Sequence, residues 1–88
     1  MLIVWDQPKR DLNIEKYGLD FADLTLAFFD TALVLPAHSA RYRAIGLHEG
    51  VLLVAVIFRP LGSEALAVVS MRRASTAERR LYDAARQN

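Results

Sequence analysis

The sequence contains no cysteine and few residues that interrupt regular structure, with four glycines and three prolines among 88 residues. The absence of cysteine excludes a disulfide framework and a thiolate metal site. The longest apolar run, Val51–Phe58, is too short to span a bilayer. The apolar start Leu2–Trp5 is too short for a signal peptide and is followed at once by Asp6. We therefore expect a cytoplasmic protein with no membrane segment.

Histidine is also scarce, with His38 and His48 as its two positions. Both lie in expected loops, and no carboxylate spacing around them matches a metal-ligand pattern. The sequence thus indicates no metal and no other cofactor. His38 stays a candidate RNA contact, because imidazole titrates near neutral pH. His48, at an expected hairpin tip, is interpreted as a polar turn residue.

The short chain limits both the number of domains and the kind of site. We expect one domain over residues 1–88, whose 53% hydrophobic content is enough for one core. A chain of this length buries only about 60–65% of the surface that it exposes when unfolded. No room remains for a large enclosed active site. Any site is therefore an open surface cleft, which suits a polymeric substrate better than a small metabolite.

Lysine is absent after Lys16, and the two parts of the chain differ in charge. Residues 1–30 contain three basic and six acidic side chains, whereas the remainder contains eight arginines and four acids. Arginine is the side chain best suited to bidentate contacts with phosphate. This asymmetry indicates two surfaces with different partners, although scattered solvated charges explain it equally well.

The N-terminal segment predicts a strand followed by a helix. Leu2–Trp5 has the pattern of a short strand, and Asp6 is a suitable cap for the helix that follows. That helix is expected from Pro8 to Tyr17, ending at Gly18. Helical spacing places three side chains on one polar, basic face: Lys9, Asn13 and Lys16.

A second helix is expected to begin at Asp20, with three apolar side chains along one side as core: Phe21, Leu24 and Phe28. Four strands should follow: Ala32–Leu35, Tyr42–Leu47, Val51–Phe58 and Ala65–Arg72. A hairpin loop is expected at residues 48–50, and a turn at Arg59–Ser63. Consecutive strands joined by short loops predict an antiparallel meander.

The C-terminal segment predicts a further helix. Ser75 and Glu78 fit a capping box, so the helix should begin there and extend to about Arg86. Three of its side chains are expected to face the sheet: Leu81, Ala84 and Ala85. The predicted order is β-α-α-β-β-β-β-α. Helices on one face of a small antiparallel sheet make an α+β domain.

Three ordered groups of residues resemble the BrnT family of bacterial toxins. The N-terminal signature is Ile3-Val4-Trp5-Asp6-Gln7-Pro8-Lys9-Arg10 with Asn13, Lys16, Gly18 and Phe21. The segment Arg43-Ala44-Ile45-Gly46 resembles the central strand of the family. The C-terminal part resembles Arg59-Pro60-Leu61-Gly62-Ser63-Glu64-Ala65-Leu66, Val69-Ser70-Met71-Arg72, Ala74-Ser75 and Glu78-Arg79-Arg80. The combination covers nearly the whole chain.

This resemblance implies a RelE-like RNase fold and endonucleolytic cleavage of RNA that arrests growth. It also implies neutralisation by a cognate BrnA-like antitoxin of the ribbon-helix-helix type, which itself binds operator DNA. The chain departs from the family pattern at one position. Many relatives have Lys-His-Gly where this chain has Lys16-Tyr17-Gly18. If that histidine provides acid–base chemistry in relatives, Tyr17 must replace it or another group performs the step.

Metal-independent RNA cleavage needs a base for the 2′-hydroxyl, charge stabilisation at the phosphate and an acid for the leaving 5′-oxygen. Arg72 is the first candidate, because it ends a strand, shares a strand face with Ser70 and lies beside the N-terminus of the last helix. The other candidate catalytic residues are Arg79, Glu64 as a carboxylate base, Lys9 and Arg43. The candidate RNA-binding residues are Arg41, Arg59 and His38.

Each candidate also has a purely structural interpretation. Arg72 can pair with a carboxylate, Arg43 and Arg41 can cover apolar surface, and Glu64 can form a salt bridge at its turn. The main alternative function is a non-catalytic module that binds nucleic acid or an acidic partner. The lack of an obvious histidine–carboxylate pair favours it. A further alternative is a degenerate toxin that retains only antitoxin binding.

Overall fold

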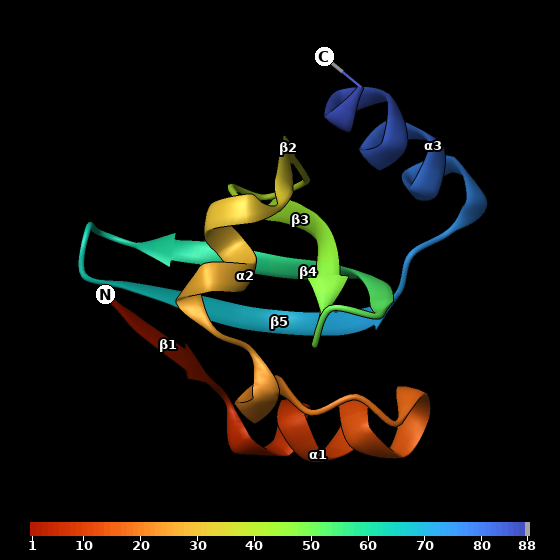
Figure 1. Cartoon of the computed structure of the whole chain (residues 1–88). Coiled ribbons are helices and arrows are strands. Elements are labelled where there is room, and N and C mark those ends of the chain that lie inside the picture. The colour runs from red at the N-terminus through yellow and green to blue at the C-terminus, as the bar shows by residue number, and fades with distance from the viewer. Residues whose placement is uncertain (88) are drawn as a thin grey trace.

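The computed structural model describes residues 1–87 and has five strands and three α-helices (Figure 1). An additional 3₁₀ helix, η1, separates α1 from α2. The elements are β1 (Leu2–Trp5), α1 (Gln7–Tyr17), η1 (Phe21–Asp23), α2 (Leu26–Thr31), β2 (Leu33–Pro36), β3 (Tyr42–His48), β4 (Leu52–Leu61), β5 (Ala65–Arg73) and α3 (Thr76–Arg86). The α+β class is as predicted. No helix of the described part is long and apolar enough to cross a membrane.

The five strands form one sheet in the order β1-β5-β4-β3-β2. The pairs from β2 to β5 are antiparallel, as the expected meander requires, whereas β1 pairs with β5 in parallel. The prediction of an entirely antiparallel sheet was therefore wrong. The reason is the crossover through α1, η1 and α2, which carries the chain from β1 to the far edge before three reversals return it.

Strand β4 extends beyond its expected end and includes part of the predicted turn. Arg59 and Pro60 are strand residues, and the turn lies at residues 62–64, where Gly62 has a φ of +61°. Proline is tolerated there because β3 begins at Tyr42, opposite Phe58, so the residues of β4 beyond Phe58 have no partner on that side. The register shifts between Ile57 and Phe58, which marks a bulge against β5.

The predicted second helix is divided in two. Asp20 caps η1, and Thr25 then accepts a hydrogen bond from the Phe28 N–H at 3.3 Å to start α2. A side chain that caps a new helix also ends the preceding turn, which explains the interruption. The predicted core side chains of this segment are all buried: Phe21, Leu24 and Phe28.

Helices cover both faces of the sheet, contrary to the expectation of one. The larger core lies beneath η1 and α2 and includes Val54, Val56 and Met71. On the opposite face, Tyr82 of α3 packs with Ile45, Leu53 and Ala55.

The expected buried stripe of α3 was also wrong. Glu78 and Tyr82, one helical turn apart, are its buried residues. By contrast, Leu81 is 46% exposed, and Ala84 and Ala85 are also exposed. The helix therefore contacts the sheet through Glu78 and Tyr82, and Ala85 and Arg86 line a small pocket with Leu33 of β2.

Helix α1 lies beside the free edge of β5, beyond the end of β1 (Figure 1). The buried Asn13 joins the two elements, because its amide accepts from the Met71 N–H at 3.0 Å and donates to the Met71 carbonyl at 2.9 Å. A second donation to the Leu19 carbonyl, at 2.9 Å, fixes the segment after the helix. The Asn13 side chain therefore makes the hydrogen bonds to the N–H and carbonyl of Met71 that a neighbouring strand would otherwise make.

Candidate functional site

Three polar side chains share the face of the sheet on which α3 packs. Arg72 pairs with Ala55 in the register, and Ser70 pairs with Ile57, which in turn pairs with Arg43. Side chains two residues apart on a strand lie on the same face, so Ser70 and Arg72 are neighbours there, as predicted. The half-buried Ile57 forms the floor between Ser70 on β5 and Arg43 on β3.

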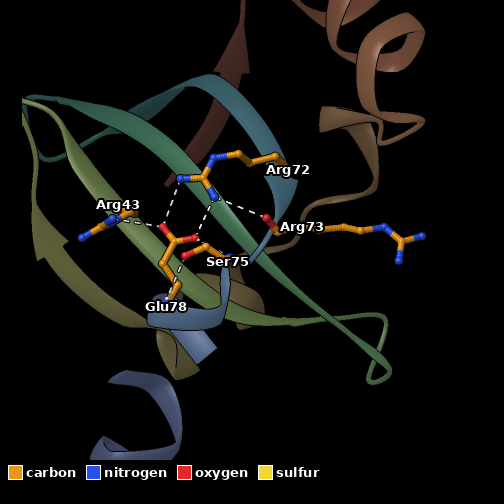
Figure 2. Close-up of polar contacts among 5 residues, drawn as sticks. All are labelled: Arg43, Arg72, Arg73, Ser75 and Glu78. Carbon is orange, nitrogen blue, oxygen red and sulfur yellow. Dashed lines mark hydrogen bonds and ion pairs between the residues drawn. The ribbon is translucent and has the colours of Figure 1, made fainter. Parts of the chain in front are cut away.

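Glu78, from the first turn of α3, joins the two arginines (Figure 2). Arg72 donates from Nη1 and Nη2 to the two carboxylate oxygens at 2.7 and 3.0 Å. Arg43 donates from Nη1 to Oε2 at 3.0 Å. The carboxylate also accepts from the Ser75 N–H at 2.8 Å, which completes the predicted capping box. In Figure 2 the guanidinium of Arg73 points away from this group.

The electrostatics of this arginine cluster, Arg43, Arg72 and Glu78, favour its charged form. Hydrogen bonding to Arg72 lowers the pKa of Glu78 to about 2, although its burial acts in the opposite direction. The same contact raises the pKa of Arg72 above its usual range. Two guanidinium groups and one carboxylate leave the cluster with one excess positive charge. Arg72 thus pairs with a carboxylate, as its purely structural interpretation predicts.

Both arginines remain accessible although the carboxylate is not. The side chains of Arg72 and Arg43 are 34% and 32% exposed, whereas that of Glu78 is 3% exposed. The buried Nε atoms of Arg41 and Arg43 have no hydrogen-bond partner within residues 1–87. Leaving a buried donor unpaired costs about 1–3 kcal/mol. Because these two Nε atoms are buried, an anion from solvent would contact Arg43 through the exposed part of its side chain instead.

An open cleft of about 620 Å³ lies between α1 and β5, next to the arginine cluster. Lys9, Lys16 and Tyr17 line it from α1, and Ser70 lines it from β5. The shared basic face predicted for α1 therefore faces this cleft. Tyr17 lies close enough to Arg72 to contribute to the raised pKa of that guanidinium. Tyr17 is 40% exposed, and Lys16 Nζ lies 5.1 Å from the centre of its ring.

Two predicted residues, Glu64 and Arg79, lie apart from the arginine cluster. Glu64 is in the β4–β5 turn, eight residues from Arg72 along an extended strand, which is on the order of 25 Å. Arg79 follows Glu78 but lines another pocket, with Val51, Tyr82 and Arg86 among its neighbours. The structure thus does not support Glu64 as a base for a phosphate at Arg72, and Arg79 lines a pocket that includes none of Arg43, Arg72 and Glu78.

The candidate RNA-binding residues lie beside the cluster on β4 and in the loop before β3. Arg59 is exposed and, two residues beyond Ile57, lies on the same face as Arg43. Arg41 precedes β3 in a tight turn, where its N–H donates to the His38 carbonyl at 3.2 Å. His38 is exposed in that loop. Arg59 and Arg41 can extend a phosphate track, whereas no described contact gives His38 a role.

Sequence reasoning missed the part that Glu78 plays in this site. The capping box was visible as Ser75 and Glu78, three residues apart, but a capping box involves only contacts with the nearby backbone. The contacts with Arg43, 35 residues earlier, and with Arg72 depend on how α3 docks on the sheet. No local sequence signal reports that docking.

Comparison with known proteins identifies the family. The family model that describes the ribonuclease toxin BrnT of type II toxin–antitoxin systems matches residues 5–78 of the chain. The chain is similar to the Brucella abortus ribonuclease toxin BrnT, known from a crystal structure at 1.1 Å resolution, with 56% sequence identity. This similarity covers 86% of the present chain and 99% of that one, with a TM-score of 0.82. No functionally curated protein matches. The resemblance seen in the sequence is thus confirmed, and the chain belongs to the BrnT family of ribonuclease toxins of type II toxin–antitoxin systems.

Proposed function

We propose that this chain is a metal-independent endoribonuclease that binds the scissile phosphate at Arg72 and Arg43. The observation that carries the proposal is the arginine cluster on an open sheet face, where two partly exposed guanidinium groups are held by one buried carboxylate. Arginines oriented in advance stabilise developing phosphate charge without reorganising at the moment of reaction. We further propose that the fold is of the RelE-like RNase type.

In the proposed reaction, the ribose 2′-oxygen attacks the adjacent phosphorus, and the bond from phosphorus to the 5′-oxygen breaks. A base takes the proton of the 2′-hydroxyl, and an acid gives a proton to the leaving oxygen. The products are a 2′,3′-cyclic phosphate and a 5′-hydroxyl. Arg72 and Arg43 stabilise the extra charge on the phosphate oxygens, and Glu78 positions both guanidinium groups.

Proton transfer is assigned to the neighbouring cleft. Glu78 is a poor base, because its pKa is about 2 and both carboxylate oxygens already accept hydrogen bonds. Tyr17 lies in the cleft near Arg72, and Lys9 lines the same cleft. We propose that Tyr17 carries the acid–base step where many relatives have histidine, and that Lys9 contacts a flanking phosphate.

A cleavage assay with purified chain tests this function. An oligoribonucleotide is incubated in excess chelator, beside the same strand made entirely of 2′-deoxyribose. We expect cleavage of the ribose strand alone, with 2′,3′-cyclic phosphate and 5′-hydroxyl ends. Cleavage of the deoxyribose strand, or loss of all cleavage in the chelator, would contradict the mechanism.

A non-catalytic nucleic-acid-binding module is the second candidate. It is favoured by the absence of a histidine–carboxylate pair from the arginine cluster and its cleft, as far as residues 1–87 show. It predicts salt-dependent RNA binding with no cleavage, with or without ribosomes. The same assay, repeated with ribosomes, therefore separates the two candidates.

The proposed partner is an antitoxin of the BrnA-like, ribbon-helix-helix type, through which operator DNA would be contacted. A toxin that cuts RNA acts in the cytoplasm, where its substrate is. The acidic N-terminal part offers one surface for the antitoxin, with exposed Asp11, Glu15 and Asp30. Asp20 is not available in the same way, because it accepts hydrogen bonds from Arg10 at 2.7 and 2.9 Å. The arginine cluster and its cleft offer the other surface.

A further inference from the structure

Three potential metal ligands meet at the tip of the β3–β4 hairpin, away from the arginine cluster. Asp23 comes from η1, His48 ends β3, and Glu49 begins the following turn. Each offers one ligand atom, and these atoms all lie within 4.8 Å of one another. They line a pocket of about 320 Å³ whose other walls include α2 residues Ala27 and Phe28. This pocket therefore opens on the face of the sheet that α2 covers.

The burial of His48 distinguishes this group from an ordinary acidic surface patch. Its side chain is only 10% exposed, and its Nε2 lies 3.2 Å from Glu49 Oε1. The imidazole is thus held in place, whereas Glu49 is 65% exposed and free to adjust. Asp23 is also exposed. A fixed nitrogen ligand flanked by two adjustable carboxylates is a suitable starting geometry for binding an ion.

The distances fit one metal ion. Ligands about 2.0–2.2 Å from Zn²⁺ lie roughly 3–4.4 Å from one another. The existing separation of 3.2 Å between His48 and Glu49 is in this range. Small rotations of the exposed carboxylates bring the remaining ligand atoms, now within 4.8 Å, to such distances.

We propose that Asp23, His48 and Glu49 form a binding site for a divalent first-row transition-metal ion, best represented by Zn²⁺. Imidazole nitrogen with carboxylate oxygen suits such ions, whereas Mg²⁺ prefers oxygen ligands alone. Three protein ligands leave at least one position for water. Because Asp23 is distant from the hairpin in sequence, the bound ion links η1 to β3 and stabilises the folded chain. The site lies on the face opposite the arginine cluster, so this proposal does not depend on the ribonuclease mechanism.

No metal-ligand spacing is visible in the sequence, because the three ligands are not all close together along the chain. His48 and Glu49 are adjacent, but Asp23 joins them only through packing of η1 and α2 against the hairpin. The second histidine, His38, lies outside this group and serves as a matched control.

Zn²⁺ titration of the full chain, by calorimetry and by thermal unfolding, tests the proposal. We expect one site per chain and a rise in Tm of roughly 10 °C or more at a concentration about 100 times the Kd. Co²⁺ added in place of Zn²⁺ should change its visible absorption, because the His48 imidazole replaces one of its water ligands. The same concentration of Mg²⁺ should not change Tm.

Variants assign the binding to these ligands. Asp23→Asn and Glu49→Gln should each weaken binding by at least roughly 10–100-fold, the loss typical of outer-shell partners alone. Both residues are exposed, so these variants should fold, and they keep the test valid if His48→Gln does not. His38→Gln and Asp30→Asn should bind as the parent does. Absence of binding by the parent, or equal binding by the Asp23 and Glu49 variants, would overturn the proposal.

Discussion

At the scale of single residues, Glu78 performs two tasks with one carboxylate. It completes the cap of α3 through Ser75 and holds Arg72 and Arg43 on the open face of the sheet. Its side chain is 3% exposed, so removing its charge leaves two guanidinium groups without their partner in a partly dry site. Stability and phosphate binding therefore both depend on this residue.

We predict that Glu78→Gln lowers the free energy of unfolding by about 1–3 kcal/mol, less than for a fully buried ion pair, because both arginines are about one-third exposed. It should also slow RNA cleavage, because the two arginines lose their orientation. Denaturant unfolding and the cleavage rate measure the two effects. Asp83→Asn, an exposed change in the same helix, is the control and should alter stability by less than about 0.5 kcal/mol. Equal stability of the two variants would contradict this role.

The same contacts predict a loss of stability in acid. The pKa values of Glu78 and Asp20 are both lowered to about 2, by hydrogen bonds from Arg72 and Arg10 respectively. A lowered pKa in the folded state stabilises the fold above the ordinary carboxyl pKa, and this contribution is lost as pH falls towards 2. Unfolding followed between pH 5 and pH 2 should therefore show falling stability. Glu78→Gln should have a shallower fall than the parent, and an identical slope would contradict the assignment.

At the scale of secondary structure elements, Asn13 attaches α1 to the free edge of β5. Asn13→Leu removes the partners of the buried Met71 N–H and carbonyl, so we predict a loss of about 2–3 kcal/mol. Glu15→Gln, at an exposed position of α1, should cost less than about 0.5 kcal/mol. Denaturant midpoints measure both. A neutral Asn13→Leu would show that the packing of α1 does not depend on this amide.

Local signals were sufficient to predict most elements from the sequence. The caps at Asp6 and Ser75 and the αL Gly18 formed as expected, because these motifs depend only on nearby residues. The parallel pairing of β1 and the buried face of α3 were not predicted. Both depend on contacts between distant segments, which periodicity does not report.

At the scale of the whole molecule, the fold brings residues far apart in sequence to one open face. Arg43, Ser70 and Arg72 could be predicted as candidates, because strand alternation fixes which side chains share a face. Glu64 and Arg79 lie outside the arginine cluster for different reasons. The sequence could not show that β5 would separate Glu64 from Arg72, or that Arg79 would line a different pocket with Leu53 and Tyr82.

The most direct test of the central claim is the single-turnover rate of RNA cleavage by Arg72→Ala and Arg43→Ala. The control is Arg80→Ala, an exposed arginine of α3 outside the arginine cluster. If the cluster binds the scissile phosphate, each cluster variant should lose about 10²–10³ in rate, as removal of one transition-state donor typically costs. The control should cleave as the parent does, and circular dichroism should show that all three fold. Parental rates in both folded cluster variants would contradict the account.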